Sequence, residues 1–306
     1  MEPSSAFASA FTVMSWNLFK WKGVTVHDWP NERQAGMHAT VQTLLPDILC
    51  TQETAPEYLD TILDCHDAYK CVLPDDTTVK ENLSQTDPVR KEPFLAKHLR
   101  TRRGNLGSEN DSEGWLEEGN IVWRSDKFDF VSHGTVDVGI QDAESRKPKR
   151  GLFFVRLRPR IPHAKSILVS TAHLTWEGGS GTEQIPPYTS ERCAQARRII
   201  DAIKTVRQQD EPVILCGDMN DSWHVPFMMR DNGLHAFDFL LKTPTEMTHP
   251  ARPCYHEERI PSQTRDWIFS DRLKPIMGRV CGNMTLGLNR HPSDHFPVLC
   301  VYEVPS

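Results

Sequence analysis

The chain has 306 residues, of which 38% are hydrophobic and 25% charged, and its formal net charge is −6. These values are typical of a soluble protein with a sizeable core, and the acidic balance argues against a broad basic surface for duplex DNA. No stretch approaches the roughly 20 apolar residues that a membrane-spanning helix needs. Residues 1–16 carry Glu2 and no Lys or Arg, unlike a secretory signal, so we expect a cytoplasmic protein, with the nucleus as the alternative.

Apolar, β-branched runs alternate along the chain with segments of helical periodicity. The first part predicts strands at 11–17 and 47–53 around a helix at 31–45, followed by a short helix at 57–65. Strands follow at 120–125, 128–138, 152–158 and 166–174, and a long helix at 189–207 has Ser190 as its N-cap. The last part predicts a buried strand at 213–216, a short helix at 226–231, and strands at 265–270 and 296–304.

The spacing of these elements predicts one domain. Between about 75 and 118 the composition turns polar, which indicates a long surface excursion from the core. The chain shows no internal repeat and no linker, and its strands are spread evenly along it. We therefore predict a single α/β sandwich domain over residues 1–306, with a core at about 11–304.

The positions of the cysteines indicate that they pack in the core and do not bind zinc or take part in redox reactions. Eight are present, and none forms the C-x-x-C pair of a zinc ribbon or a thioredoxin-type site. Cys50, Cys216 and Cys300 lie inside apolar runs, where a free thiol acts as a small core residue. We expect all of them to be reduced and structural.

Two basic segments stand out on this acidic chain. Residues 89–103 hold six Lys/Arg and one acid, and residues 145–151 hold four Lys/Arg and no acid. They are either contacts for a phosphate chain near one site or solvated loops, and the sequence leaves both interpretations open.

Chemically capable residues stand at the ends of the predicted strands. Alone, each has an ordinary explanation as a cap or a turn residue, but neighbouring strand ends converge in space. In VILCGDMND (213–221), we expect Gly217 to allow a tight turn, while Asp221 has no assigned role beyond a cap towards the next helix. The residues at strand ends are Asn17, Glu53, Glu118, His173, Asp218 with Asn220, Asp266, and Asp294 with His295.

The residue types in this set indicate a hard cation. Carboxylates and amide oxygens without cysteine or clustered histidine ligands favour Mg²⁺ or Mn²⁺ over zinc. Mg²⁺ uses only one or two carboxylates, which leaves the other acids free to handle protons or to orient a histidine. Histidines beside a divalent cation can stabilise the charge of a phosphoryl transition state. The combination therefore indicates phosphoester hydrolysis.

Six blocks in order resemble the signature of the endonuclease/exonuclease/phosphatase superfamily, which includes deoxyribonuclease I. They are SWN, TQE, STAHL, GDMND, RDWIF and PSDHFPV, and they cover about residues 11–304. G-D-x-N followed much later by S-D-H before a terminal strand is the most specific part, although the blocks do not resolve the branch of the superfamily. The resemblance implies a four-layered α/β sandwich, with two central mixed or antiparallel β-sheets flanked by helices.

The resemblance also implies roles for the residues that match its motifs. Glu53 matches the metal-binding glutamate, with Asn17 beside it and Asp294 as a further contact. Asp218 matches the aspartate that orients or deprotonates the attacking water, and Asn220 matches the residue that steadies the phosphate.

The two histidines take the remaining catalytic roles by the same resemblance. His295 matches the catalytic histidine, with Asp266 as the carboxylate that orients it. His173 matches the phosphate-binding histidine, and Glu118 is a candidate acidic partner for it. Arg150 precedes a strand much as a phosphate-contacting arginine does in deoxyribonuclease I, with Arg146, Lys147 and Lys149 as competitors for that role.

Motif chemistry and resemblance together predict a Mg²⁺- or Mn²⁺-dependent phosphodiesterase. We expect a monomer that acts as a nuclease on nucleic acid or on a nucleotide, with Trp176 in the loop after His173 either stacking a base or packing. A phosphomonoesterase or phosphodiesterase for a small-molecule or lipid phosphate is the alternative. A scaffold of the same fold without activity is a remote third hypothesis.

Overall fold

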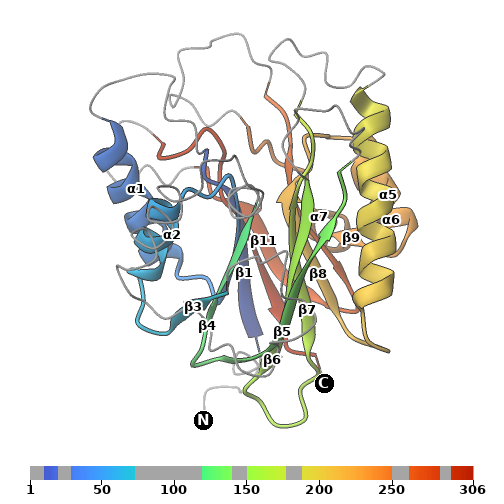
Figure 1. The fold of residues 1–306 in the computed structure, drawn as a ribbon, viewed down its shortest axis with the longest axis horizontal. Helices are drawn as coiled ribbons and strands as arrows, with labels where there is room; N and C mark the ends of the chain where they lie inside the picture. The colour runs from blue at the N-terminus through green and yellow to red at the C-terminus, as the bar shows by residue number, and fades with distance from the viewer. Residues whose placement is uncertain are drawn as a thin grey trace, which may run out of the picture.

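Two six-stranded β-sheets lie face to face and carry helices on their outer faces (Figure 1). The computed structural model describes residues 10–19, 29–72, 119–139, 150–176, 188–249, 262–282 and 291–305. Within them, α1 and α2 lie on one side of the paired sheets, and α5 and α6 lie on the other. The four-layered sandwich expected from the sequence is therefore confirmed.

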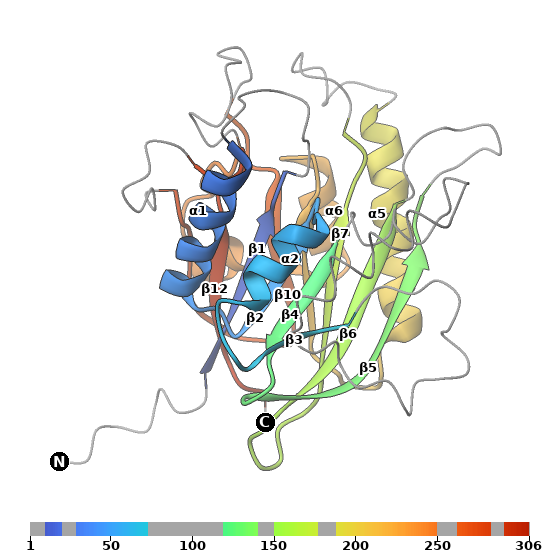
Figure 2. The same cartoon turned by 60° about the vertical axis from the view of Figure 1, so that its left-hand side comes forward.

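The first sheet has the strand order β11-β12-β1-β2-β4-β3. β1 is parallel to β2, and the other neighbours are antiparallel. Two helices, α1 (Trp29–Leu44) and α2 (Pro56–Leu63), cover its outer face, and Figure 2 shows α2 lying across β2 and β4. The strands are β1 (Ala10–Asn17), β2 (Ile48–Gln52), β3 (Tyr69–Cys71), β4 (Asn120–Arg124), β11 (Pro275–Val280) and β12 (Val298–Glu303).

The second sheet has the strand order β5-β6-β7-β8-β10-β9. β7 is parallel to β8, and the remaining pairs are antiparallel. Its outer face packs against α5 (Tyr188–Val206) and α6 (His224–Asp231), while α7 (Phe237–Leu241) contacts β11. The strands are β5 (Phe128–Asp137), β6 (Gly151–Pro159), β7 (Ile167–His173), β8 (Val213–Asp218), β9 (His235–Ala236) and β10 (Asp266–Asp271).

The core between the sheets is apolar except near one end. Cys50, Cys216 and Cys300 are buried in it as free thiols, as expected from their apolar surroundings in the sequence. At one end, the Gln52 side-chain amide donates a 2.9 Å hydrogen bond to the Thr171 hydroxyl across the gap between the sheets. This buried polar contact fixes the end of β2 against the end of β7, which is where the candidate site lies.

Several short elements were not apparent in the sequence. The pattern did not predict β3, β9, α7 or β11, and the last strand begins at Val298 rather than at 296. β11 is largely exposed at a sheet edge, with Met277 half exposed, so its sequence carries no alternation of apolar and polar residues. The polar excursion expected at 75–118 lies outside the described residues. Among the helices described, none is long and apolar enough to cross a membrane.

Gly217 lies within β8, and the turn expected at it is not seen. Its backbone has no left-handed φ. A Cβ at this position would overlap the carbonyl oxygen of Ala172 on the neighbouring β7. Glycine is therefore required by the close approach of the two parallel strands, just before Asp218 enters the site.

Candidate active site

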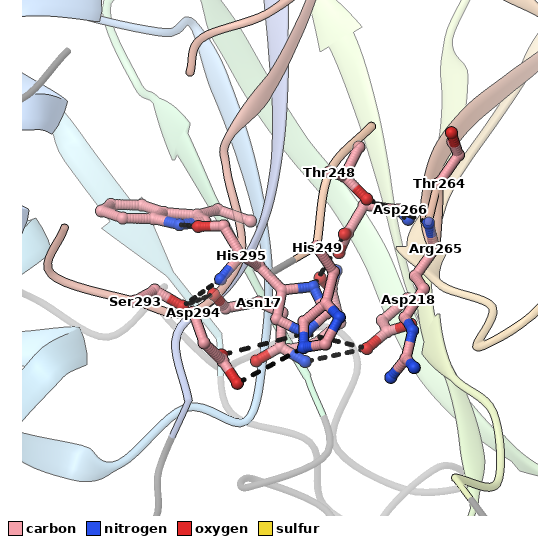
Figure 3. Close-up of polar contacts among 12 residues, drawn as sticks. Asn17, Asp218, Thr248, His249, Thr264, Arg265, Asp266, Ser293, Asp294 and His295 are labelled. Atoms are coloured by element: carbon pink, nitrogen blue, oxygen red, sulfur yellow. Dashed lines mark hydrogen bonds and ion pairs between the residues drawn. The ribbon is translucent and has the colours of Figure 1, made fainter. Parts of the chain in front are cut away.

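The ends of strands from both sheets meet at one edge of the sandwich, because β1, β2, β7 and β8 finish there while β10 begins there. In the register of the second sheet, Asp218 lies beside His173 on one side and beside Asp266 on the other. The edge gathers buried or largely buried polar side chains from Asn17, Glu53, His173, Asp218, Asn220, Asp266, Asp294 and His295 (Figure 3 labels Asn17, Asp218, Asp266, Asp294 and His295).

His295 and Asp266 form a close buried pair. The His295 Nδ1–H donates to Asp266 Oδ2 at 2.7 Å, and both side chains are almost completely buried. Burial alone would lower the pKa of His295, but the neighbouring carboxylates, of which Asp266 is the nearest, raise it to about 10. Burial also raises the pKa of Asp266, although the His295 charge opposes that rise. The imidazole is thus held in its charged form with Nε2–H directed away from Asp266.

We expect this pair to be visible in the pH dependence of the metal-free protein. Since the pKa of His295 is raised from 6.5 to about 10, its contribution to stability is complete below pH 6.5 and is lost as pH approaches 10. In ¹⁵N NMR at pH 8, both ring nitrogens of His295 should carry protons, and Asp266→Asn should restore titration near the ordinary value. A neutral His295 ring at pH 8 in the wild-type protein would contradict this assignment.

Asp218 is contacted from three sides. Asn17 Nδ2 donates to its Oδ2 at 3.0 Å, and the Nε2 atoms of His173 and His295 each lie 3.7 Å from the same oxygen. The Asn220 backbone N–H donates to its other oxygen at 2.9 Å. Burial alone would raise the pKa of Asp218, but the surrounding positive groups, with His295 first, hold it well below its usual range. Asp218 therefore stays ionised at neutral pH.

Glu53 and Asn17 form the part of the site that fits a hard cation. Asn17 is fully buried, and its amide donates to Glu53 Oε1 at 3.2 Å. Glu53 has a left-handed φ of 50°, an uncommon conformation that points its carboxylate into the site just after β2. The Glu53 carboxylate supplies the oxygen donor that Mg²⁺ or Mn²⁺ prefers. The Asn17 side-chain oxygen accepts from the Phe19 backbone N–H at 2.9 Å, so the contact of Asn17 with the cation stays a prediction.

Asp294 lies next to two histidines. Its Oδ2 is 3.7 Å from His249 Nε2, and its Oδ1 is 3.9 Å from His295 Nε2 and has no hydrogen-bond partner. Burial would raise the pKa of Asp294, but the charge of His295 lowers it. Its expected contact with the cation at Glu53 stays a prediction.

His173 presents a hydrogen-bond donor to the site. Arg150 lies with its Nη1 3.0 Å from His173 Nδ1, and both side chains are buried. Because a guanidinium can only donate, Nδ1 accepts and the ring proton sits on Nε2. That Nε2 is 3.9 Å from Glu53 and 3.7 Å from Asp218, so the donor faces both carboxylates.

Asn220 is held in a fixed orientation at the turn after β8. Its φ is 47°, and its amide donates to the Leu174 carbonyl at 3.0 Å. Arg265 donates to the Asn220 side-chain oxygen at 3.3 Å, which brings a second positive charge close to Asp218. The left-handed conformation is one that asparagine tolerates better than most residues, which explains its place in the motif.

Asp221 has a structural role. Its Oδ1 accepts hydrogen bonds from the backbone N–H groups of Trp223 and His224, at 2.8 and 2.6 Å, at the start of α6. Its Oδ2 lies 3.5 Å from the Nε of the fully buried Arg192. Asp221 therefore caps the helix that follows the motif, as the sequence suggested.

Two loops hold the pair formed by His295 and Asp266, through residues to which the sequence assigned no role. Ser293 donates to the Asn17 carbonyl at 2.6 Å and accepts from the His295 N–H at 3.2 Å, which ties the end of β1 to the histidine. The Thr248 hydroxyl accepts from the Asp266 N–H at 3.1 Å. The adjoining His249 packs against His295 with ring centroids 4.6 Å apart and ring planes tilted by 48°. The segment around Thr248 has no periodicity, so nothing in the sequence marked it.

The other predicted contacts are only partly described. Trp176 is 49% exposed beyond the end of β7, three positions after His173, and so is accessible for stacking. Glu118 lies outside the described residues, as do nearly all residues of the basic segments 89–103 and 145–151. Arg150 and Gly151 are the exceptions, and Arg150 contacts His173.

Comparisons with known proteins agree with this arrangement. The sequence profile of the endonuclease/exonuclease/phosphatase family matches residues 14–295. A comparison with curated protein sequences finds no match. Among solved structures, a humanized D. rerio TDP2 superposes with a TM-score of 0.65 at 16% identity, covering 97% of this chain and 100% of that chain.

Two further structures show the same fold. The Bacteroides thetaiotaomicron mannosyl-6-phosphatase Bt3783 has a TM-score of 0.64 and 18% identity, with 95% of this chain and 98% of that chain covered. The human Nocturnin catalytic domain with bound sulfate has a TM-score of 0.61 and 17% identity, with 96% and 94% covered.

Proposed function

The chain belongs to the endonuclease/exonuclease/phosphatase family, and from this premise we propose that it is a Mg²⁺- or Mn²⁺-dependent phosphodiesterase that acts on nucleic acid or on a nucleotide. Metal-dependent phosphoester hydrolysis is the chemistry of the family. The observation that carries the proposal is the environment of Asp218, whose Oδ2 is approached by Asn17, His173 and His295 within one buried cluster.

Glu53 and Asn17 would hold the cation, with Asp294 as a further contact. When bound, a divalent cation lowers the pKa of a coordinated water and polarises a phosphoryl oxygen. Asp218 would accept a hydrogen bond from the attacking water and align it. Because the pKa of Asp218 lies well below its usual range, the carboxylate is a weak base and serves mainly to orient the water.

The two histidines and Asn220 would stabilise the phosphoryl group from the other side. The charged His295 donates from Nε2 to a phosphoryl oxygen, while Asp266 fixes its ring. His173 donates from Nε2, while the contact of Arg150 with Nδ1 orients its ring. Donors that are already in place when charge develops are the main source of rate acceleration at such sites.

Removal of the metal is expected to abolish activity. Purified protein with Mg²⁺ or Mn²⁺ should cleave a generic phosphodiester, and chelation with EDTA should lower the rate to that of the buffer. Adding back excess Mg²⁺ should restore it, whereas Ca²⁺, with longer ligand distances, should restore less. Full activity after exhaustive chelation would contradict the proposal.

A panel of substrates separates the nucleic-acid proposal from its alternative. We expect single-stranded RNA or DNA, or a dinucleotide, to be cleaved with a higher kcat/KM than inositol phosphates, sugar phosphates or sphingomyelin. The fold shared with a mannosyl-6-phosphatase keeps a small-molecule phosphate as the second candidate. Charge reversal of the Lys and Arg residues in 89–103 and of Arg146, Lys147 and Lys149, with Arg150 left in place, should weaken nucleic-acid cleavage and its salt dependence, and should leave the cleavage of a small substrate unaffected.

Asn17 ends a strand of the first sheet and Glu53 follows another, while His173 and Asp218 end strands of the second, so both sheets of one chain supply the candidate site. We propose that the protein acts as a monomer, which light scattering coupled to size-exclusion chromatography checks. The cytoplasmic or nuclear location stays a prediction.

A further inference from the structure

His249 lies next to Asp294 and His295, and the three residues together form a set of candidate metal ligands that differs from the one at Glu53. One ligand atom from each of His249, Asp294 and His295 lies within 4.8 Å of the other two, and all three residues are buried. The closest pairs are His249 Nε2 with Asp294 Oδ2 at 3.7 Å and His295 Nε2 with Asp294 Oδ1 at 3.9 Å. Two imidazoles and one carboxylate form a set that differs from the oxygen donors at Glu53, and its carboxylate, Asp294, is also the further contact proposed for the cation at Glu53.

These separations are close to those of a tetrahedral zinc site. Zn–N and Zn–O bonds of about 2.0–2.1 Å at tetrahedral angles place ligand atoms about 3.4 Å apart. The 3.7 and 3.9 Å separations involve the two different oxygens of Asp294. With one ligand atom from each residue, the three atoms lie within 4.8 Å of one another, so a bound cation would draw them together by at most about 1.4 Å. His249 Nδ1 has no hydrogen-bond partner, so no bond resists the ring movement that this approach requires.

The surroundings of the three residues also favour a cation. Asp266 binds Nδ1 of His295 at 2.7 Å, which is the carboxylate–histidine arrangement that orients a zinc-bound imidazole and leaves Nε2 for the metal. Asp294 Oδ1 is buried and accepts no hydrogen bond. Imidazole nitrogens favour Zn²⁺ over Mg²⁺, whereas the oxygen donors at Glu53 suit Mg²⁺.

We propose that His249, Asp294 and His295 form a second, inhibitory cation site that takes Zn²⁺. Zn²⁺ bonds to Nε2 of His295 in place of its proton, which is released to solvent. The imidazole then has no N–H with which to donate to a phosphoryl oxygen. The positive charge of Zn²⁺ takes the place of the imidazolium charge beside the neighbouring carboxylates. The inhibitory consequence rests on the proposed function of His295, but the binding of Zn²⁺ does not.

Binding is tested first, without substrate. Calorimetric titration with Zn²⁺ in saturating Mg²⁺ should show one site in the wild-type protein, and Co²⁺ should give the intense visible absorption of four-coordinate cobalt. His249→Gln should weaken Zn²⁺ binding by at least about 10-fold. His163→Gln, at an exposed histidine, is the matched control and should bind as the wild type does. Equal Zn²⁺ affinity in wild type and His249→Gln would overturn the proposal.

Two further readouts make the result decisive. His249→Cys should still bind Co²⁺ and should show a sulfur-to-cobalt charge-transfer band, which appears only if position 249 supplies a ligand. If the folded His249→Cys variant shows no such band, the proposed site is overturned, even if His249→Gln does not fold. In the hydrolysis assay, the Zn²⁺ concentration for half inhibition should rise by the same factor as the binding constant. A protein that binds Zn²⁺ in this way but cleaves no phosphoester would refute the proposed function and leave the site standing.

Discussion

Replacing His295 with glutamine is expected to lower kcat by about 10²–10⁴-fold, the range for removal of a positioned proton donor. Glutamine keeps the length of a hydrogen-bonding side chain but cannot carry the positive charge that the surrounding carboxylates stabilise. It also leaves Asp266 buried with no charged partner, so that carboxyl should take up a proton instead. The measurement is steady-state hydrolysis of a phosphodiester at saturating Mg²⁺.

The matched control for this variant is again His163→Gln. Circular dichroism should show that both variants are folded, so that a loss of activity reports on chemistry. If His295→Gln retained a kcat within threefold of the wild type, the histidine would not be the donor to the phosphoryl group. The pairing with Asp266 would then serve only to bind β10 to the loop before β12.

The second large effect is expected for Asp218→Asn, which should also lower kcat by about 10²–10⁴-fold. The asparagine side chain has the same shape, but an NH₂ group replaces one of the two carboxylate oxygens. That NH₂ group cannot accept hydrogen bonds from Asn17 and the two histidines around it. The half-saturating concentration of Mg²⁺ should change little, because Asp218 is proposed to align water. A single-turnover assay with Mg²⁺ titration measures both quantities.

Two variants make this result specific. Asp210→Asn alters an exposed aspartate with a left-handed φ, and it should retain wild-type kinetics. Glu53→Gln should instead raise the half-saturating Mg²⁺ concentration, because Glu53 is proposed to hold the cation. If Asp218→Asn raised that concentration and left kcat unchanged at saturation, the roles assigned to Asp218 and Glu53 would have to be exchanged.

Most residues of the candidate site could be predicted from the sequence because they lie at the ends of strands. A buried strand is recognised from a short apolar run, and a polar residue that ends the run is seen in the same window. Asn17, His173 and Asp218 each occupy the last position of a strand, and Asp266 occupies a first position. The cap formed by Asp221 could also be suggested from the sequence, because it depends only on the helix that follows a few residues later.

Contacts between distant segments could not be predicted in the same way. The 3.0 Å bond from Asn17 to Asp218 joins residues 201 positions apart, and it depends on how the two sheets are stacked. The reason for glycine at position 217 could not be predicted either. It is the close approach of Ala172 on a neighbouring strand, and not a turn.

The sequence by itself determined the fold family, because this depends on local patterns and on motif order. It also predicted the residue types of the candidate site and a divalent cation. Only the tertiary structure decided which carboxylate faces which histidine, and that His249 lies against His295. The physical reason is that charge stabilisation falls off with distance through the fold, not along the chain. A histidine in an unpatterned loop became a candidate ligand only when folding placed it within reach of Asp294.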